Sequence, residues 1–146
     1  MYEDALSRVD LFSGLGKKEL KEVASCCREA TYRPDSVLIS QGEKGLGMFI
    51  LTKGTVRITR TNNSDGAEQV LGTLEAGNVF GEMALLDDLP RSATVTAIDE
   101  VTALLVPFWD FRIILRHILS SDPNIGLELM AVLSRRLRKA EQRVTE

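Results

Sequence analysis

The sequence contains few of the residues that carry chemistry on their own. Two of its 146 residues are cysteines and one is a histidine. Cys26 and Cys27 are adjacent, so they cannot link distant segments by a disulfide, and no second cluster of Cys or His completes a metal site. We interpret the pair as reduced, partly buried helix residues. His117 has no matching metal ligands or nucleophile, so we expect no metal, no cofactor and no enzymatic activity.

Long apolar runs and a strong net charge are also missing. No apolar stretch approaches the roughly 18 residues that a membrane span requires. The start, MYEDALSRVD, is acidic and lacks the apolar core of a signal peptide. We therefore expect a cytoplasmic protein with no membrane partner. The formal net charge of −3 gives no overall field that would recruit nucleic acid, so any anion site must be local.

The apolar side chains that are present suffice for one core, because 44% of this domain-sized chain is hydrophobic against 27% charged. Helical spacing over Lys17 to Arg28 predicts a helix in the first 30 residues. From Thr31 onward the pattern changes to short β-branched or apolar runs. The predicted strands are Val37–Ile39, Met48–Thr52, Val56–Thr61, Gln69–Leu74, Ala93–Ala97 and Thr102–Val106. Glycine, which takes positive φ without a Cβ clash, marks the turns between them. These turns are Gln41-Gly42, Lys53-Gly54, Asp65-Gly66 and Ala76-Gly77.

Helical spacing returns after Pro107, first over Trp109–Leu119 and then over Asn124–Val144. The sequence thus predicts one domain over residues 1–146. A helical segment (1–30) precedes a β-roll (31–107), and two helices close the chain (108–146). The fold class is mainly β with flanking helices, an antiparallel, jelly-roll-like β-roll (a double-stranded β-helix).

The last predicted helix has an apolar stripe with alternating spacings of three and four, the pattern of a coiled-coil seam. Its members are Met130, Leu133, Leu137, Ala140 and Val144. Two interpretations stay open: the stripe pairs two copies of the chain, or it packs on the chain's own barrel. Basic residues between Arg135 and Arg143 suit a solvated face and a helix C-terminus, and we infer no nucleic-acid site from them.

The segment FGEMALLDDLPRSATV, from Phe80 to Val95, is chemically the most specific. Gly81 allows close approach of a ligand to the backbone, and the first amides of a short helix beginning there favour an anion. Pro90 ends that helix, and Arg91 adds a planar, permanently charged fork that suits phosphate oxygens. A carboxylate at Glu82 would repel phosphate, so its partner is a donor such as a sugar hydroxyl. One anion and one hydroxyl describe a ribose-phosphate.

In this order and spacing the segment resembles the phosphate-binding cassette of cyclic-nucleotide-binding domains. That family includes the bacterial catabolite activator, the regulatory subunits of cAMP-dependent protein kinase and the cyclic-nucleotide-gated channels. The resemblance extends to an LFSGL start, a QGEKG turn, a MFILTKGTVRI strand pair and a closing helical pair. It implies a β-roll that senses a cyclic nucleotide.

The resemblance also implies roles for single residues. Glu82 matches the glutamate that accepts the ribose 2′-hydroxyl, and Arg91 matches the arginine that pairs with the cyclic phosphate. The remaining cassette positions expected at the ligand, several of which offer backbone amides or a hydroxyl, are Phe80, Gly81, Met83, Ala84, Ser92 and Ala93. Ser92 is similar to the small residue of cAMP binders, whereas cGMP binders tend to have threonine there, so cAMP is favoured over cGMP.

Contacts to the base are less well marked. Ile58 and Leu71 match strand positions that pack against it, although plain barrel core explains them nearly as well. On the last helix, Arg138 is a candidate to stack on the purine and Glu141 to accept from its amine. The sequence departs from the family at Leu46, which replaces a frequently acidic residue, and at Asp87-Asp88, which adds negative charge near the anion site.

We therefore expect a cAMP-binding sensor or regulatory domain that signals through movement of its C-terminal helix. The alternative is a degenerate domain that binds no nucleotide and acts as a protein-interaction or dimerisation module. Expected partners are the cyclic nucleotide, a second copy through the last helix and an effector acting in trans. Direct DNA binding is not expected, because no reading helix follows the last helix. Since Arg91 serves the ligand in this reading, we also expect its removal to cost the fold little.

Overall fold

The structure, a computed structural model, describes residues 2–87 and 89–145, without the side chains of residues 143–145. The chain forms two compact units. One, Cys27–Asp110, contains the strands, and the other combines the chain up to Cys26 with the chain from Phe111 onward. None of the described helices combines the length and the apolar content needed to cross a membrane. That the two units make up one domain stays a prediction.

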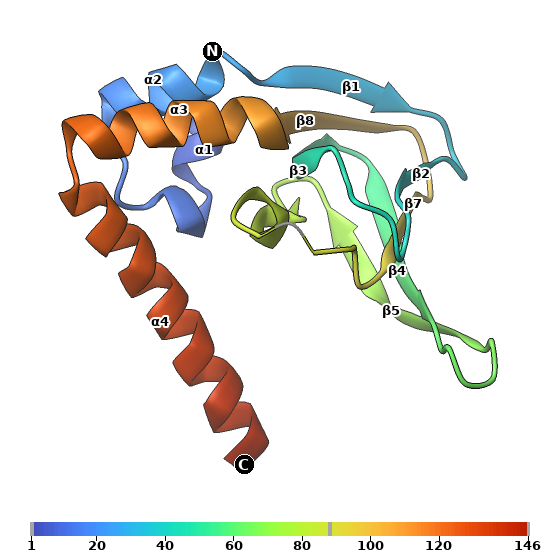
Figure 1. Ribbon diagram of the computed structural model, residues 1–146. Coiled ribbons are helices and arrows are strands. Elements are labelled where there is room, and N and C mark those ends of the chain that lie inside the picture. Colours follow the sequence, from blue (N-terminus) through green and yellow to red (C-terminus); the bar gives the residue numbers. More distant parts are fainter. Residues whose placement is uncertain (1, 88, 146) are drawn as a thin grey trace. The chain divides into compact units, whose positions relative to one another are not determined.

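The strand unit consists of two four-stranded sheets in which every pairing is antiparallel (Figure 1). The first sheet has the order β1-β8-β3-β6, with β1 Arg28–Tyr32, β8 Val101–Pro107, β3 Gly47–Lys53 and β6 Val79–Phe80. The second has the order β2-β7-β4-β5, with β2 Val37–Ile39, β7 Thr94–Ala97, β4 Thr55–Thr61 and β5 Glu68–Glu75. The predicted class, mainly β with flanking helices, is confirmed.

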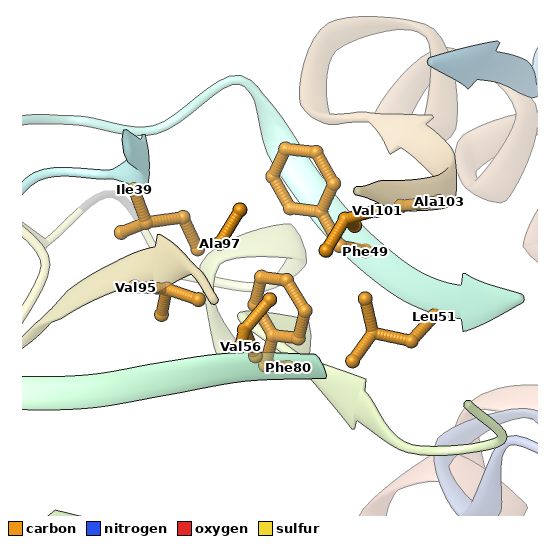
Figure 2. Packing of buried hydrophobic residues seen from close by; sticks show 9 residues of the cluster. All are labelled: Ile39, Phe49, Leu51, Val56, Phe80, Val95, Ala97, Val101 and Ala103. Atoms are coloured by element: carbon orange, nitrogen blue, oxygen red, sulfur yellow. The ribbon is translucent and has the colours of Figure 1, made fainter. Parts of the chain in front are cut away.

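The core of this unit lies between the inward faces of the two sheets. Alternate residues of the strands face it, as the period of two in an extended chain requires. Figure 2 shows its members: Ile39, Phe49, Leu51, Val56, Phe80, Val95, Ala97, Val101 and Ala103. The rings of Phe49 and Phe80 stack with centroids 5.2 Å apart. Because Phe80 ends β6, this stack fixes the point at which the chain enters the cassette.

The turns between the strands form as the sequence indicates. In the β4–β5 hairpin, Gly66 takes a φ of 70° and its N–H donates to the Asn62 carbonyl. Gly54 has a φ of 91°, and an added Cβ there would overlap the Glu100 carbonyl oxygen. The other two predicted turn glycines, Gly42 and Gly77, also have positive φ.

The second unit is helical and comprises α1 Glu3–Ser7, η1 Asp10–Phe12, α2 Lys17–Ala24, most of α3 (Phe108–Ser121) and α4 Asn124–Thr145. Phe12 and Phe111 stack with centroids 5.5 Å apart. Helix α4 approaches the first turns closely, because a Cβ added at Gly14 would lie 2.5 Å from Glu128 Cβ. Ile125 and Val132 form its buried inner face.

Two local predictions at the first boundary were wrong. The helix starting at Lys17 ends at Ala24 instead of Arg28, and β1 begins at Arg28, three residues before the predicted change at Thr31. Apolar residues at helical spacing continue as far as Cys27, which hid the boundary. Cys26 and Cys27 are half-buried as expected, but they follow the helix instead of belonging to it.

Candidate functional site

The cassette, residues 80–95, connects β6 of one sheet to β7 of the other. Gly81 has the left-handed geometry φ 78°, ψ 13°, which turns the chain from β6 into the short helix η2, Glu82–Leu85. The predicted helix is thus a single 3-10 turn of four residues, anchored by the fully buried Leu85. A turn this short sums few peptide dipoles, so the attraction for an anion must come mainly from Arg91.

A cavity of about 400 Å³ opens beside the cassette. Pockets of a few hundred cubic ångströms suit small organic ligands. Every cassette residue that the sequence places at the ligand lines this cavity: Phe80, Gly81, Glu82, Met83, Ala84, Arg91, Ser92 and Ala93. Ile58 lines it too, together with two apolar residues that sequence reasoning missed, Ile39 and Val95. Both lie in predicted strands, yet alternation alone does not distinguish a cavity wall from the core.

Arg91 is buried, with 9% of its surface exposed. Its Nη1 donates to the Gly81 carbonyl at 3.2 Å, and Nη2 donates to the Gly47 carbonyl. The Nε atom is buried and has no hydrogen-bond partner among the described residues. The backbone N–H of Arg91 donates to the Glu43 carbonyl at 2.9 Å, which connects this end of the cassette to the turn after β2.

The guanidinium fits only because two glycines lie against it. A Cβ added at Gly45 would overlap Nε and Nη2, and one added at Gly81 would lie 2.6 Å from Nη1. Gly45, which leaves room for the guanidinium, and Gly47, whose carbonyl accepts from Nη2, were not predicted as site residues. The signal for them is the QGEKGLG run, which ends on the first residue of β3 and holds more glycine than a turn needs. The expectation that Arg91 matters little to the fold stays a prediction, and the contacts argue against it, because the side chain is buried and bonded to two segments.

Two opposing influences act on the charge of Arg91. Burial lowers the pKa of its guanidinium below the ordinary value, and the negative charge of Asp87 raises it. The guanidinium has therefore lost water without gaining full compensation from the protein. An anion that reaches its donors in the cavity would supply the missing interaction.

The other polar cassette residues surround the same cavity. Glu82 is half-buried in its wall and offers carboxylate oxygens that accept hydrogen bonds. Ser92 is exposed, and its carbonyl accepts a hydrogen bond from Arg60 Nε at 3.1 Å. Among the described residues, no group of three or more His, Cys, Asp or Glu side chains is arranged to hold a metal ion.

The base-contact candidates are not all brought together. Ile58 lines the cavity, whereas Leu71 is 42% exposed on β5 and is not among the lining residues described. Arg138 and Glu141 are exposed on α4 in the helical unit, and their contact with a base stays a prediction. Leu46, the departure in the turn, is 70% exposed.

Comparison with known proteins finds relatives over most of the chain. The cyclic AMP receptor protein of Thermus thermophilus is 33% identical over 131 residues, which are 90% of this chain and 58% of that protein. A cAMP-dependent protein kinase regulatory subunit of Yarrowia lipolytica is 37% identical over 97 residues, 66% of this chain and 25% of that protein. The chain thus spans less than two thirds of either relative.

Solved structures and family models agree with these relatives. The N-terminal domain of a transcriptional regulator from Streptomyces coelicolor A3(2) matches with a TM-score of 0.79 at 30% identity, covering 97% of this chain and 95% of that one. A family model described as "cyclic nucleotide-binding domain" matches residues 29–117, which include every strand from β2 to β8 and the cassette. The resemblance predicted from the sequence is confirmed, and the chain belongs to the cyclic nucleotide-binding domain family.

Proposed function

We propose that this domain binds cAMP in the cavity beside the cassette and acts as a cytoplasmic regulatory module without catalysing a reaction. The observation that carries the proposal is the buried Arg91, which faces a cavity of about 400 Å³ together with Glu82. The family supports it as well, because the cyclic nucleotide-binding domain is a regulatory, non-catalytic fold. The names of two relatives, a cyclic AMP receptor protein and a cAMP-dependent kinase regulatory subunit, point to the same ligand.

The phosphate is assigned to Arg91. A guanidinium presents five donors in a rigid fork, and here two carbonyls occupy only part of that capacity. The buried Nε lacks a partner among the described residues. A cyclic phosphate with two free oxygens would give this buried fork a charged acceptor.

The sugar and the base are assigned to the remaining walls. Glu82 on η2 would accept the ribose 2′-hydroxyl, which keeps its negative charge away from the phosphate. The apolar side chains of Ile39, Ile58 and Val95 provide a surface for a flat base. Ser92, in place of the threonine that accompanies cGMP selectivity, supports cAMP over cGMP.

The output is assigned to the C-terminal helix. A ligand shifts a helix equilibrium only through contacts that differ between two positions of that helix. Arg138 and Glu141 on α4 are candidates for such contacts with the bound base. Because the chain spans only part of its relatives, the controlled activity is assigned to an effector, either another part of a longer chain or a separate protein.

A second copy of the chain is the proposed partner for α4. Its inner face buries Ile125 and Val132, whereas Met130 and Leu137 of the predicted seam are 59% and 61% exposed. Exposed large apolar residues at seam spacing favour pairing between chains. Under three heptads bury little area, so we expect a weak or ligand-dependent dimer. The side chain of Val144, the last member of the seam, lies outside the described residues.

Isothermal titration of the chain with cAMP, cGMP and a cyclic dinucleotide tests the proposed function. We expect one ligand per chain, cAMP binding more tightly than cGMP, and no binding of the cyclic dinucleotide, which is large for this cavity. If no cyclic nucleotide binds, the domain is the degenerate interaction module instead.

The role of Glu82 is tested on the same instrument. We expect 2′-deoxy-cAMP to bind more weakly than cAMP by about 1.5–3 kcal/mol, the scale of a hydrogen bond to a charged group. In Glu82→Gln this penalty should shrink, because the remaining acceptor is neutral. If cAMP and 2′-deoxy-cAMP bind equally well to the unmodified chain, Glu82 does not accept a hydrogen bond from the ribose 2′-hydroxyl.

A further inference from the structure

The cavity beside the cassette holds more negative than positive charge. Among the residues described as lining it, three carry a charge: Glu82, Asp87 and Arg91. Arg91 supplies one positive charge and the two carboxylates supply two negative charges, so the wall has a net charge of about −1 at neutral pH. Glu82 already has a role in the proposed function. Asp87 does not, and a second carboxylate in a site for an anion requires an explanation.

Asp87 is held in place by hydrogen bonds to Met83 and Leu89. Its N–H donates to the Met83 carbonyl at 3.1 Å, and its Oδ1 accepts from the Leu89 N–H at 3.2 Å. The residue is half-buried. It also lines a neighbouring cavity of about 160 Å³, so it stands in the wall between the two cavities. The charge therefore has a defined position in the cavity wall.

The charge of Asp87 also acts on Arg91. Its carboxylate raises the pKa of the guanidinium, in opposition to the effect of burial. A carboxylate in the cavity wall that acts on Arg91 acts on a bound phosphate as well, with the opposite sign. Coulomb energy is proportional to the charge of the ligand, so a doubly charged phosphate is repelled twice as strongly as a singly charged one.

We propose that Asp87 determines specificity by ligand charge, making the cavity favour a cyclic phosphodiester over a nucleoside 5′-monophosphate. The proposal rests on the proposed function and assigns to it a further residue. A cyclic phosphodiester carries one negative charge. Hydrolysis of the ring adds water and produces a monoester, which carries between about 1.5 and 2 negative charges at pH 7. Arg91 alone would attract the monoester more strongly, and the second carboxylate opposes that attraction in proportion to the charge of the ligand.

The test compares cAMP with 5′-AMP on three proteins at pH 7.5 and low salt. Asp87→Asn removes the charge but keeps an oxygen that accepts the Leu89 N–H. Glu29→Gln is the control of equal charge change, because Glu29 is exposed on β1, separated from β6 by β8 and β3 in the sheet. Affinity for cAMP is measured by titration, and affinity for 5′-AMP by competition against cAMP.

For Asp87→Asn we expect cAMP to bind about 3- to 10-fold more tightly, the effect of one charge at several ångströms in a partly hydrated site. Affinity for 5′-AMP should rise by roughly the square of that factor, because its charge is nearly double. Glu29→Gln should change neither affinity. Equal factors for the two ligands, no change, or weaker binding of either ligand overturns the proposal.

Two further outcomes are separable. If the unmodified chain binds no cAMP, the proposed function fails and the role of Asp87 falls with it. If cAMP binds and Asp87→Asn changes the affinities for cAMP and 5′-AMP by the same factor, only the role of Asp87 fails. If Asp87→Asn does not fold, a salt series on the unmodified chain replaces it. Salt screens repulsion of the dianion, so the preference for cAMP over 5′-AMP must narrow as salt rises, and a constant preference overturns the proposal.

Discussion

Replacing Gly81 by alanine tests the geometry of the cassette. Gly81 has a φ of 78°, and an added Cβ would lie 2.6 Å from Arg91 Nη1 and 3.2 Å from the Gly47 carbonyl oxygen. The new methyl group therefore strains the backbone and pushes against the guanidinium. Arg91 cannot yield toward Gly45, because its Nε and Nη2 already lie against that residue. The bond from Nη1 to the Gly81 carbonyl should break.

The expected magnitude follows from these contacts. Left-handed geometry costs an alanine about 1–2 kcal/mol. The lost bond from a charged donor costs about 1.5–3 kcal/mol. Alanine also restricts the unfolded chain, which returns about 0.4–1 kcal/mol. We therefore expect Gly81→Ala to lower the free energy of unfolding by about 2–4 kcal/mol.

Gly77→Ala is the matched control. Gly77 has a φ of 96°, and nothing lies within 4 Å of the position of its added Cβ. It should show the backbone strain alone, about 0.5–1.5 kcal/mol. Urea unfolding followed by far-ultraviolet circular dichroism measures both variants, and titration with cAMP shows whether binding is lost in Gly81→Ala only. Equal destabilisation of the two variants, or unchanged cAMP binding in Gly81→Ala, would refute the assigned contact between Gly81 and Arg91.

Two further predictions concern the core and α4. Phe49→Ala should lower the free energy of unfolding by about 3–5 kcal/mol, measured in urea, and weaken cAMP binding, because Phe80 loses the ring that positions it at the cavity. Leu137→Glu should shift a weak dimer to monomer in sedimentation with cAMP present, because it places an unpaired charge in the proposed seam. Ile113→Glu, at a residue 62% exposed on α3, should leave the mass unchanged. If the unmodified chain is monomeric in every condition, α4 does not pair two copies of the chain.

Most of the strand unit was predictable from local signals. The Val37–Ile39 run has the bounds of β2, and Asp65-Gly66 forms the turn of the β4–β5 hairpin because glycine there takes positive φ. By contrast, β1 was missed because Arg28–Tyr32 has no clean alternation and follows a helical pattern without a break. Its extended geometry depends on pairing with β8, whose residues lie 69 to 77 positions further along the chain.

The candidate site was predictable in its residues and less so in its geometry. The order of Gly81, Glu82 and Arg91 in one segment was enough to place them together, and all three line the cavity. The contacts of the guanidinium were not predictable, because Gly45 and the Gly47 carbonyl lie next to Arg91 only through the sheet pairing of β3. A residue that accepts through its backbone has no side-chain signal in the sequence.

The affinity for cAMP of the unmodified chain and of Arg91→Ala, measured by isothermal titration, tests the central claim most directly. Circular dichroism at the temperature of the titration first shows that the variant is folded, since Arg91 is buried and bonded to the Gly81 and Gly47 carbonyls. Because the variant leaves a desolvated phosphate unpaired, we expect binding weaker by about 2–5 kcal/mol, roughly 30-fold or more. A folded Arg91→Ala protein that binds cAMP as tightly as the unmodified chain would contradict the assignment of the phosphate to Arg91.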